Sequence, residues 1–153
     1  MTVGFSQDDK SRLTELLSRE LEIFKQVLDN TVKQTELLAE DDAYAFNISL
    51  DLRQELIEKI NGLHQESDIL MQSYISYCES GGGERIAEID AITDRLRNII
   101  SECAGINERN EAAAKEMAEG YIKRIDKLNV TRKSLRKYIH DLPNNPELFD
   151  RIT

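Results

Sequence analysis

The sequence predicts an all-α fold, an antiparallel bundle or coiled coil of three long helices in which the third is much longer than the first two. Apolar residues return every three or four positions through most of the 153 residues, which is the spacing of one face of a helix. Helix breakers are scarce, because the chain has two prolines and one cluster of glycines, at residues 81–83. No stretch alternates apolar and polar residues for long enough to predict a strand.

The first two helices are expected at residues 7–40 and 43–79. Acidic residues at 40–42 suit a helix start, where unpaired backbone N–H groups need acceptors, and the glycines at 81–83 permit the turn that ends the second helix. The seam of the first helix consists of Leu13, Leu17, Leu21, Phe24, Leu28, Val32, Thr35 and Leu38. The seam of the second consists of Phe46, Leu50, Arg53, Ile57, Ile60, His64, Ser67, Met71, Tyr74 and Cys78.

The third helix is expected at residues 84–141, followed by a tail at residues 143–153. It would extend over roughly 87 Å, against about 50–55 Å for each of the first two. Short connections make consecutive helices antiparallel neighbours, so we expect a single helical domain covering residues 1–153. The seam of the third helix consists of Ile86, Ile89, Ile92, Leu96, Ile100, Cys103, Ile106, Asn110, Ala114, Met117, Tyr121, Ile125, Leu128, Leu135, Ile139 and Leu142.

Beyond about Gly120 the third helix carries an apolar stripe that the first two helices are too short to cover. Such a patch favours binding to another molecule over exposure to water. Two alternatives stay open. A break near Gly105–Asn110 or at Gly120, where glycine weakens a helix by about 1 kcal/mol relative to alanine, would let the chain cover its own stripe. Alternatively, the stripe pairs with its copy in a homodimer. The stripe consists of Tyr121, Ile122, Ile125, Leu128, Leu135, Tyr138, Ile139 and Leu142.

The charge of the chain changes at the same place. Residues 120–140 hold seven basic residues against Asp126 alone, a net charge of +6, whereas the rest of the chain holds 13 basic and 28 acidic residues, a net charge of −15. Nucleic acid is not expected as a partner, because the acidic remainder would repel phosphates and no recognition motif accompanies the basic residues. A basic and apolar helix suits an acidic amphipathic helix or groove.

The residues give little support for catalysis, and no cofactor or metal is expected. Ser80-Gly-Gly-Gly lacks the lysine and the preceding strand of a phosphate-binding loop. His64 and His140 have no neighbouring ligand set for zinc. Serines are not arranged with histidine and aspartate in a nucleophile signature, so we do not expect an enzyme.

Two further patterns bear on where the protein works. Cys78 and Cys103 would lie roughly 25–30 Å apart in the expected bundle, too far for a disulfide. No apolar run approaches the roughly 20 residues of a membrane span, so stable membrane insertion is not expected. Residues 1–10 lack the basic and apolar regions of a secretory signal. We therefore expect a cytoplasmic protein.

The chain resembles the FlgN family of flagellar export chaperones, which serve the hook-associated proteins of the hook–filament junction. Most of the resemblance lies in the first eighty residues, although it covers most of the chain, with similar size, acidity and long helices. The matching segments are Leu13-Thr-Glu-Leu-Leu, Glu20-Leu-Glu-Ile-Phe-Lys-Gln-Val-Leu, Lys33-Gln-Thr-Glu-Leu-Leu, Asp42 before the second helix, and Arg53-Gln-Glu-Leu-Ile-Glu-Lys-Ile.

The resemblance implies a protein that binds the terminal amphipathic helix of a hook-associated protein, prevents its premature assembly and delivers it to the type III export gate. A family tyrosine near the C-terminus, thought to dock at that gate, has its nearest match in Tyr138, although the residues around it differ. The alternative is a structural or signalling coiled-coil module that self-associates through its C-terminal helix. The implied client-binding residues are Tyr121, Ile125, Leu128, Leu135, Ile139 and Leu142, with Lys127, Arg132 and Lys133 at the rim.

Overall fold

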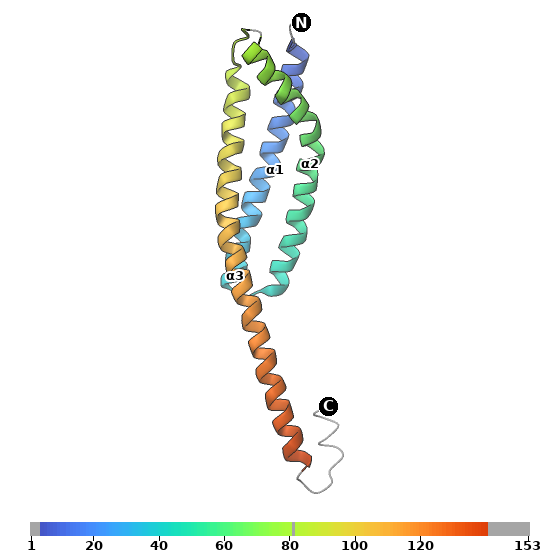
Figure 1. Cartoon of the computed structure of the whole chain (residues 1–153), viewed down its shortest axis with the longest axis vertical. Coiled ribbons are helices and arrows are strands. Elements are labelled where there is room, and N and C mark those ends of the chain that lie inside the picture. The colour runs from blue at the N-terminus through green and yellow to red at the C-terminus, as the bar shows by residue number, and fades with distance from the viewer. Residues whose placement is uncertain (1–3, 81, 141–153) are drawn as a thin grey trace. The chain divides into compact units, whose positions relative to one another are not determined.

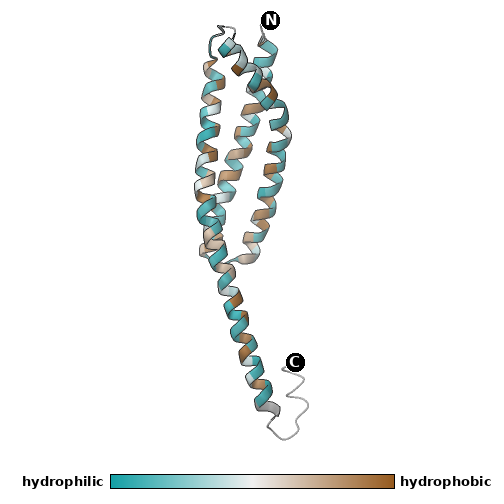
Figure 2. Ribbon diagram, viewed as in Figure 1, coloured by the Kyte–Doolittle hydropathy of each residue, from teal (hydrophilic) through white to brown (hydrophobic). Residues whose placement is uncertain are grey.

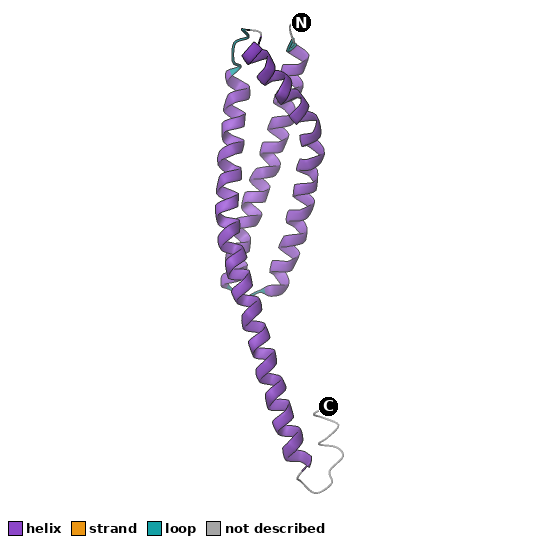
Figure 3. Cartoon of the chain, viewed as in Figure 1, coloured by secondary structure: helices purple, strands orange, loops and turns teal. Residues whose placement is uncertain are grey.

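The computed structural model describes residues 4–80 and 82–140, with side chains up to Lys137. Three helices follow one another along the chain: α1 (Gln7–Ala39, 33 residues), α2 (Ala43–Ser80, 38 residues) and α3 (Ala87–His140, 54 residues). The described residues contain no strand (Figure 3). The predicted all-α fold class with a long third helix is therefore confirmed.

Local hydrogen bonds define where α1 starts and where α2 follows it. The Ser6 hydroxyl accepts from the Asp9 N–H at 3.0 Å, and the Asp9 carboxylate accepts from the Ser6 N–H at 3.1 Å, which completes a capping box. At the turn, Asp41 has φ 57°, and the carboxylate of Asp42 accepts from the Ala45 N–H at 3.1 Å. Asp42 therefore serves the helix-start role expected for this acidic stretch.

The connection between α2 and α3 is longer than expected, because α3 begins at Ala87 and not at residue 84. The Ile86 N–H donates to the Tyr74 hydroxyl at 2.8 Å. Gly83 packs so closely on the ring of Tyr77 that an added Cβ would lie 2.4 Å from a ring carbon. Gly82 has φ 61°, which glycine adopts without steric cost. These contacts hold residues 82–86 outside the helix.

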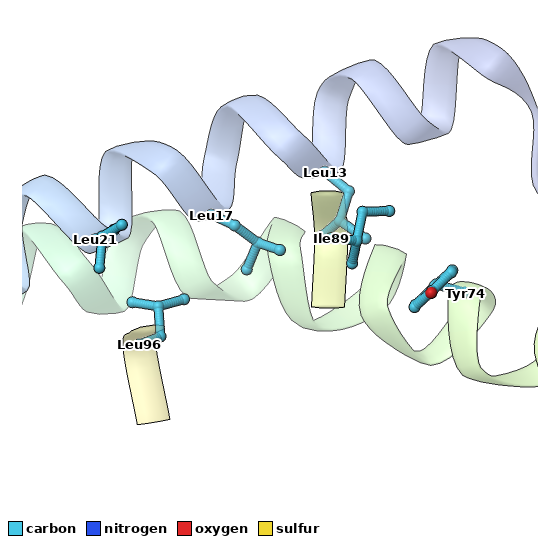
Figure 4. Packing of buried hydrophobic residues seen from close by; sticks show 6 residues of the cluster. All are labelled: Leu13, Leu17, Leu21, Tyr74, Ile89 and Leu96. Atoms are coloured by element: carbon cyan, nitrogen blue, oxygen red, sulfur yellow. The ribbon is translucent and has the colours of Figure 1, made fainter. Parts of the chain in front are cut away.

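The chain divides into two compact units, one ending at Glu111 and one beginning at Ala112, and each is described by itself. In the first unit α1 lies between α2 and α3 (Figure 1). Its main core cluster joins all three helices, and Figure 4 shows the six buried side chains: Leu13, Leu17 and Leu21 of α1, Tyr74 of α2, and Ile89 and Leu96 of α3. A second cluster continues the core with Val27, Leu56, Ile60 and Cys103.

The core becomes polar near the end of α1, which corrects the predicted seam. Val32 is exposed, and the buried stripe passes instead through Asn30, Thr31 and Gln34. These side chains are buried because each finds a hydrogen-bond partner. Asn110 of α3 donates to the Thr31 carbonyl at 2.9 Å and accepts from the Thr35 hydroxyl at 2.7 Å.

Two more of these polar side chains bond within α1 and to α2. The Asn30 amide donates to the Ser49 carbonyl at 3.1 Å, and the Gln34 amide donates to Asn30 Oδ1 at 3.1 Å. The same correction applies to Leu50 in α2, which is exposed, whereas Ser49 is buried. The predicted seams followed apolar residues and so missed positions where hydrogen bonding replaces apolar contact.

Tyr74 joins α2 to the start of α3. Its ring is 1% exposed and packs 5.4 Å from the ring of Phe5. Its hydroxyl accepts from the Ile86 N–H and donates to Asp90 Oδ1 at 3.1 Å. Burial disfavours the phenolate and raises the pKa of Tyr74 to about 12.

Because the pKa of Tyr74 is higher in the folded chain than the ordinary value near 10, its contribution to stability is complete below about pH 10 and is lost as the pH rises to about 12. We expect the free energy of unfolding to fall by about 2–3 kcal/mol over this interval from Tyr74 alone. Urea unfolding of the chain and of Tyr74→Phe, at pH 9 and pH 11.5, measures this term. An equal decline in both proteins would contradict it.

The two cysteines are free thiols in different surroundings. Burial raises the pKa of Cys103, whereas Cys78 is only half-buried. Because the thiolate is the reactive form, we expect iodoacetamide to alkylate Cys78 at least about tenfold faster than Cys103 at pH 8. Peptide mass spectrometry over a time course measures both rates in one sample. Equal rates in the folded chain, with a rise for both on adding urea, would show that the core around Cys103 opens readily.

Candidate functional site

Residues 120–137 of α3, here called the basic segment, carry large apolar side chains that are exposed to solvent. α3 is continuous through Gly105 and Gly120, so the break considered for these positions is not present. In Figure 2 apolar and hydrophilic residues alternate along this stretch of α3. The exposed apolar side chains are Ile122, Ile125, Leu128, Val130 and Leu135.

Most of these side chains fall on one face of the helix. Tyr121, Ile125, Leu128 and Leu135 follow one another at spacings of four and three residues, or sums of them, which keeps them in line. Val130 lies two positions after Leu128, about 200° around the helix, and belongs to the opposite face. Leu128 and Val130 are equally exposed, at 65% each. The segment therefore has one seam, and two exposed apolar residues, Ile122 and Val130, lie outside it.

Arg132 belongs to the same seam. It stands four positions after Leu128 and three before Leu135, so a continuous helix places it between them. This position refines the expectation that Arg132 lies at the rim with Lys127 and Lys133. The seam of the basic segment is thus Tyr121, Ile125, Leu128, Arg132 and Leu135, with a cation at its centre.

Tyr121 is the one half-buried member of this seam. The guanidinium carbon of Arg124 lies 4.8 Å from the centroid of its ring, within the range of a cation–π contact. Arg124 thereby shields one face of the ring. The remaining basic side chains of the segment are exposed: Lys123, Lys127, Arg132, Lys133, Arg136 and Lys137.

Three predicted site residues cannot be placed by their side chains. The backbones of Tyr138 and Ile139 belong to α3, but their side chains lie outside the described residues. Leu142 and the tail at residues 143–153 lie outside them altogether. The structure thus brings Ile125, Leu128 and Leu135 together on one exposed face and leaves the proposed roles of the other three as predictions.

The first unit holds a second feature, a groove of about 370 Å³ between α2 and α3 with α1 as its floor, here called the α2–α3 groove. Apolar side chains make up most of its lining: Leu17 and Phe24 of α1, Ile60 and Met71 of α2, and Leu96 and Ile100 of α3. Glu20 and Asp68 are its two carboxylates, and no lysine or arginine lines it. The groove is therefore apolar with a negative charge.

Glu20 lies on the floor of the groove and is 3% exposed. The Ser67 hydroxyl donates to Glu20 Oε1, and His64 Nδ1 lies 3.7 Å from the same oxygen. Among the described residues, no side chain donates to Oε2. Oε2 is not among the fully buried side-chain atoms that lack a partner, so it reaches solvent and an incoming donor can bond to it.

The predicted site did not include Glu20, although the sequence carried a signal for it. Glu20 stands three positions after Leu17 and four before Phe24, which is a seam spacing. A charged residue at a seam position is usually exposed to solvent, with an apolar neighbour buried in its place. The sequence alone therefore favoured Leu21 as the seam residue. Both are buried in the structure.

The described part of the chain holds neither a metal site nor a membrane-spanning helix. No group of three or more His, Cys, Asp or Glu side chains is placed to hold a metal ion. None of the helices, as far as they are described, is both long enough and apolar enough to cross a membrane.

The chain matches the model of a known protein family. The sequence model of the family described as FlgN protein matches residues 1–144, which includes the whole first unit and the basic segment. No curated protein and no solved structure matches the chain.

Proposed function

The chain belongs to the FlgN family of flagellar export chaperones, and from this premise we propose that it binds the terminal amphipathic helix of a hook-associated protein in the cytoplasm. Binding would cover the surface through which the client polymerises, prevent premature assembly, and keep the client competent for delivery to the export gate. The proposed client-binding face is the seam of the basic segment, continued by Ile139 and Leu142 and rimmed by Lys127 and Lys133.

The observation that carries this proposal is the exposed apolar seam at Ile125, Leu128 and Leu135. Apolar side chains that recur on one face of a helix bind the apolar face of a second helix, because each side chain inserts between residues of the facing helix. The seam supplies such a face ready formed on a regular helix, so binding would require little ordering of the chaperone.

Charge would add selectivity to this contact. The basic segment has seven basic side chains against Asp126, so it attracts an acidic helix and repels a basic one. Arg132 at the centre of the seam favours a client helix with a carboxylate or another acceptor at the matching position. Surface charges contribute mainly to the association rate, whereas the apolar seam contributes most of the affinity.

Tyr138 is proposed for the further step, docking at the export gate, because it is the nearest match to the tyrosine that the family carries near its C-terminus. This role is separate from client binding. A Tyr138→Ala variant would lose export in a motility or secretion assay to a much greater extent than its affinity for a client helix falls.

Isothermal titration of the full chain with a synthetic peptide tests the proposal, the peptide being the C-terminal amphipathic helix of a hook-associated protein from the same organism. We expect one peptide bound per chain, with affinity that weakens as salt is raised from 50 to 500 mM because part of the attraction is between charges. A scrambled peptide of the same composition serves as the control. Equal binding of both peptides, or binding of neither, would contradict the proposal.

A further inference from the structure

We propose that, without a client, the basic segment of a second copy of this chain lies in the α2–α3 groove, with Arg132 of the second copy beside Glu20. The two surfaces would then cover each other in a self-associated resting form. What this form does to client binding rests on the function proposed above, whereas the contact itself rests on the observations that follow.

The first observation is the chemistry of the groove. Its lining is apolar apart from a few polar groups, and its two carboxylates are not accompanied by lysine or arginine. Glu20 is buried at the floor, and both of its recorded contacts, from Ser67 and His64, are at Oε1. The groove therefore suits an apolar helix that brings a positively charged donor to Glu20 Oε2.

The second observation is the chemistry of the basic segment, which matches this requirement. Its seam is apolar at Ile125, Leu128 and Leu135, and its centre holds the guanidinium of Arg132. Among the described residues, no carboxylate pairs with Arg132. An apolar seam that carries the cation of Arg132 and an apolar groove that carries two carboxylates, one of them the buried Glu20, are complementary in charge and in apolar character.

The third observation is length. The part of α2 that lines the groove runs from Ile60 to Met71, a rise of about 16 Å. The part of the seam from Ile125 to Leu135 has a similar rise, about 15 Å. One groove can therefore accommodate the three apolar anchors together with the central arginine.

The molecule that we propose for the α2–α3 groove is a second copy of this chain. Thr93 and Ile100, which line the groove, and the basic segment belong to one continuous helix. A second copy carries the same basic segment, whose charge and apolar seam are complementary to the groove. Association between two copies of this chain requires no other protein to be present.

A client would compete with this contact, because both use the seam of the basic segment. The resting form would keep the apolar seam out of water when client is scarce, which reduces aggregation. The groove would become vacant whenever a client takes the segment. Client binding would therefore be coupled to dissociation of the two copies. The coupling free energy would equal the free energy of the contact between the copies.

Sedimentation velocity on the full chain, over a concentration series, tests the pairing of Glu20 with Arg132. We expect self-association that is at least tenfold weaker in Glu20→Gln and in Arg132→Gln, and no weaker in the double variant than in either single one, because both remove the same contact. Lys133→Gln is the matched control, since it removes one neighbouring charge outside the seam, and we expect it to change association less than threefold. Thermal unfolding checks that Glu20→Gln is folded.

Two results would overturn the proposal. One is a chain that stays monomeric at all concentrations up to several hundred micromolar. The other is association that weakens in Arg132→Gln but not in a folded Glu20→Gln, because segments would then pair with each other and leave the groove empty.

Disulfide trapping between differently tagged copies tests the same contact without relying on charge. In a background with Cys78→Ser and Cys103→Ser, one copy carries Asp68→Cys at the groove and the other carries Leu128→Cys or Leu135→Cys on the seam. We expect a mixed disulfide from at least one of the two seam positions and none from the control Val130→Cys. A disulfide formed only between two seam cysteines, or only within one copy, would refute the proposal.

Addition of the client peptide separates this inference from the proposed function. If the peptide binds to a chain that does not self-associate, the proposed contact between copies is wrong and the proposed chaperone function is still supported. Self-association with the trapped contact, but without displacement or binding by the peptide, would support the contact and remove the function.

Discussion

The double variant Leu128→Asp, Leu135→Asp is expected to bind the client helix at least about 100-fold more weakly than the unchanged chain. Central apolar anchors of an interface commonly contribute about 2 kcal/mol or more each when they are removed. Aspartate adds a further cost, because its charge would be desolvated against an acidic client. Both residues are exposed in the free chain, so the substitutions remove no core contact and the chain should fold as before.

Val130→Asp is the matched control for this variant. Val130 is as exposed as Leu128, at 65%, and lies on the opposite face of the same helix. Val130→Asp introduces one negative charge into the same segment without touching the seam, against two in the double variant, and we expect binding to change less than about threefold, as it usually does for rim charges. Isothermal titration with the client peptide gives both affinities. Equal losses from the two variants would show that charge, and not the seam, holds the client.

A chain truncated after Met117 is expected to lose client binding completely while its remaining part stays folded. Both core clusters lie before Glu111, in the first unit, as do the hydrogen bonds of Asn110 to α1. The residues removed include exposed Ile125, Leu128 and Leu135, which contribute no buried surface to that core. Circular dichroism should show a helical protein whose thermal midpoint lies within a few degrees of the full-length value.

Unfolding of the truncated chain would contradict this prediction. It would show that the C-terminal segment is needed for stability, as a structural coiled-coil module would require. Truncation after Leu142 provides the control, because it keeps every proposed client-binding residue while removing the tail, and it should retain most of the affinity for the client peptide.

The fold class could be predicted because the core obeys a simple repeat. The buried residues of α3 in the first unit, Ile89, Leu96, Cys103 and Asn110, stand seven positions apart, which is the repeat of a helix that keeps one face on its neighbours. The start of α3 could not be predicted, because it depends on a hydrogen bond from Ile86 to Tyr74, twelve residues earlier in the chain.

Polar residues in the core were the part that pattern reading missed. Thr31 and Gln34 replace Val32 in the buried stripe of α1 because partners on α2 and α3 satisfy the polar groups around them. A single sequence does not show which polar residue will find such a partner. The same limit hid Glu20, whose burial depends on the Ser67 hydroxyl 47 residues away.

The candidate site was easier to predict than the core, because it requires only a helix and a spacing. The exposed positions Ile125, Leu128 and Leu135 follow from periodicity alone, and the basic character of the segment follows from composition. Arg132 could be placed in the seam only once α3 was known to be continuous. The sequence did not settle this, because Gly105 and Gly120 allowed a break.

Hydrogen–deuterium exchange of the full chain, with and without the client peptide, tests most directly whether residues 120–140 hold the client. The account predicts slower exchange of amide hydrogens in peptic fragments covering this segment when the peptide is bound. Fragments of α1 should not be slowed by the client. Slower exchange confined to α1, α2 and the first half of α3, with no change beyond residue 120, would contradict the account.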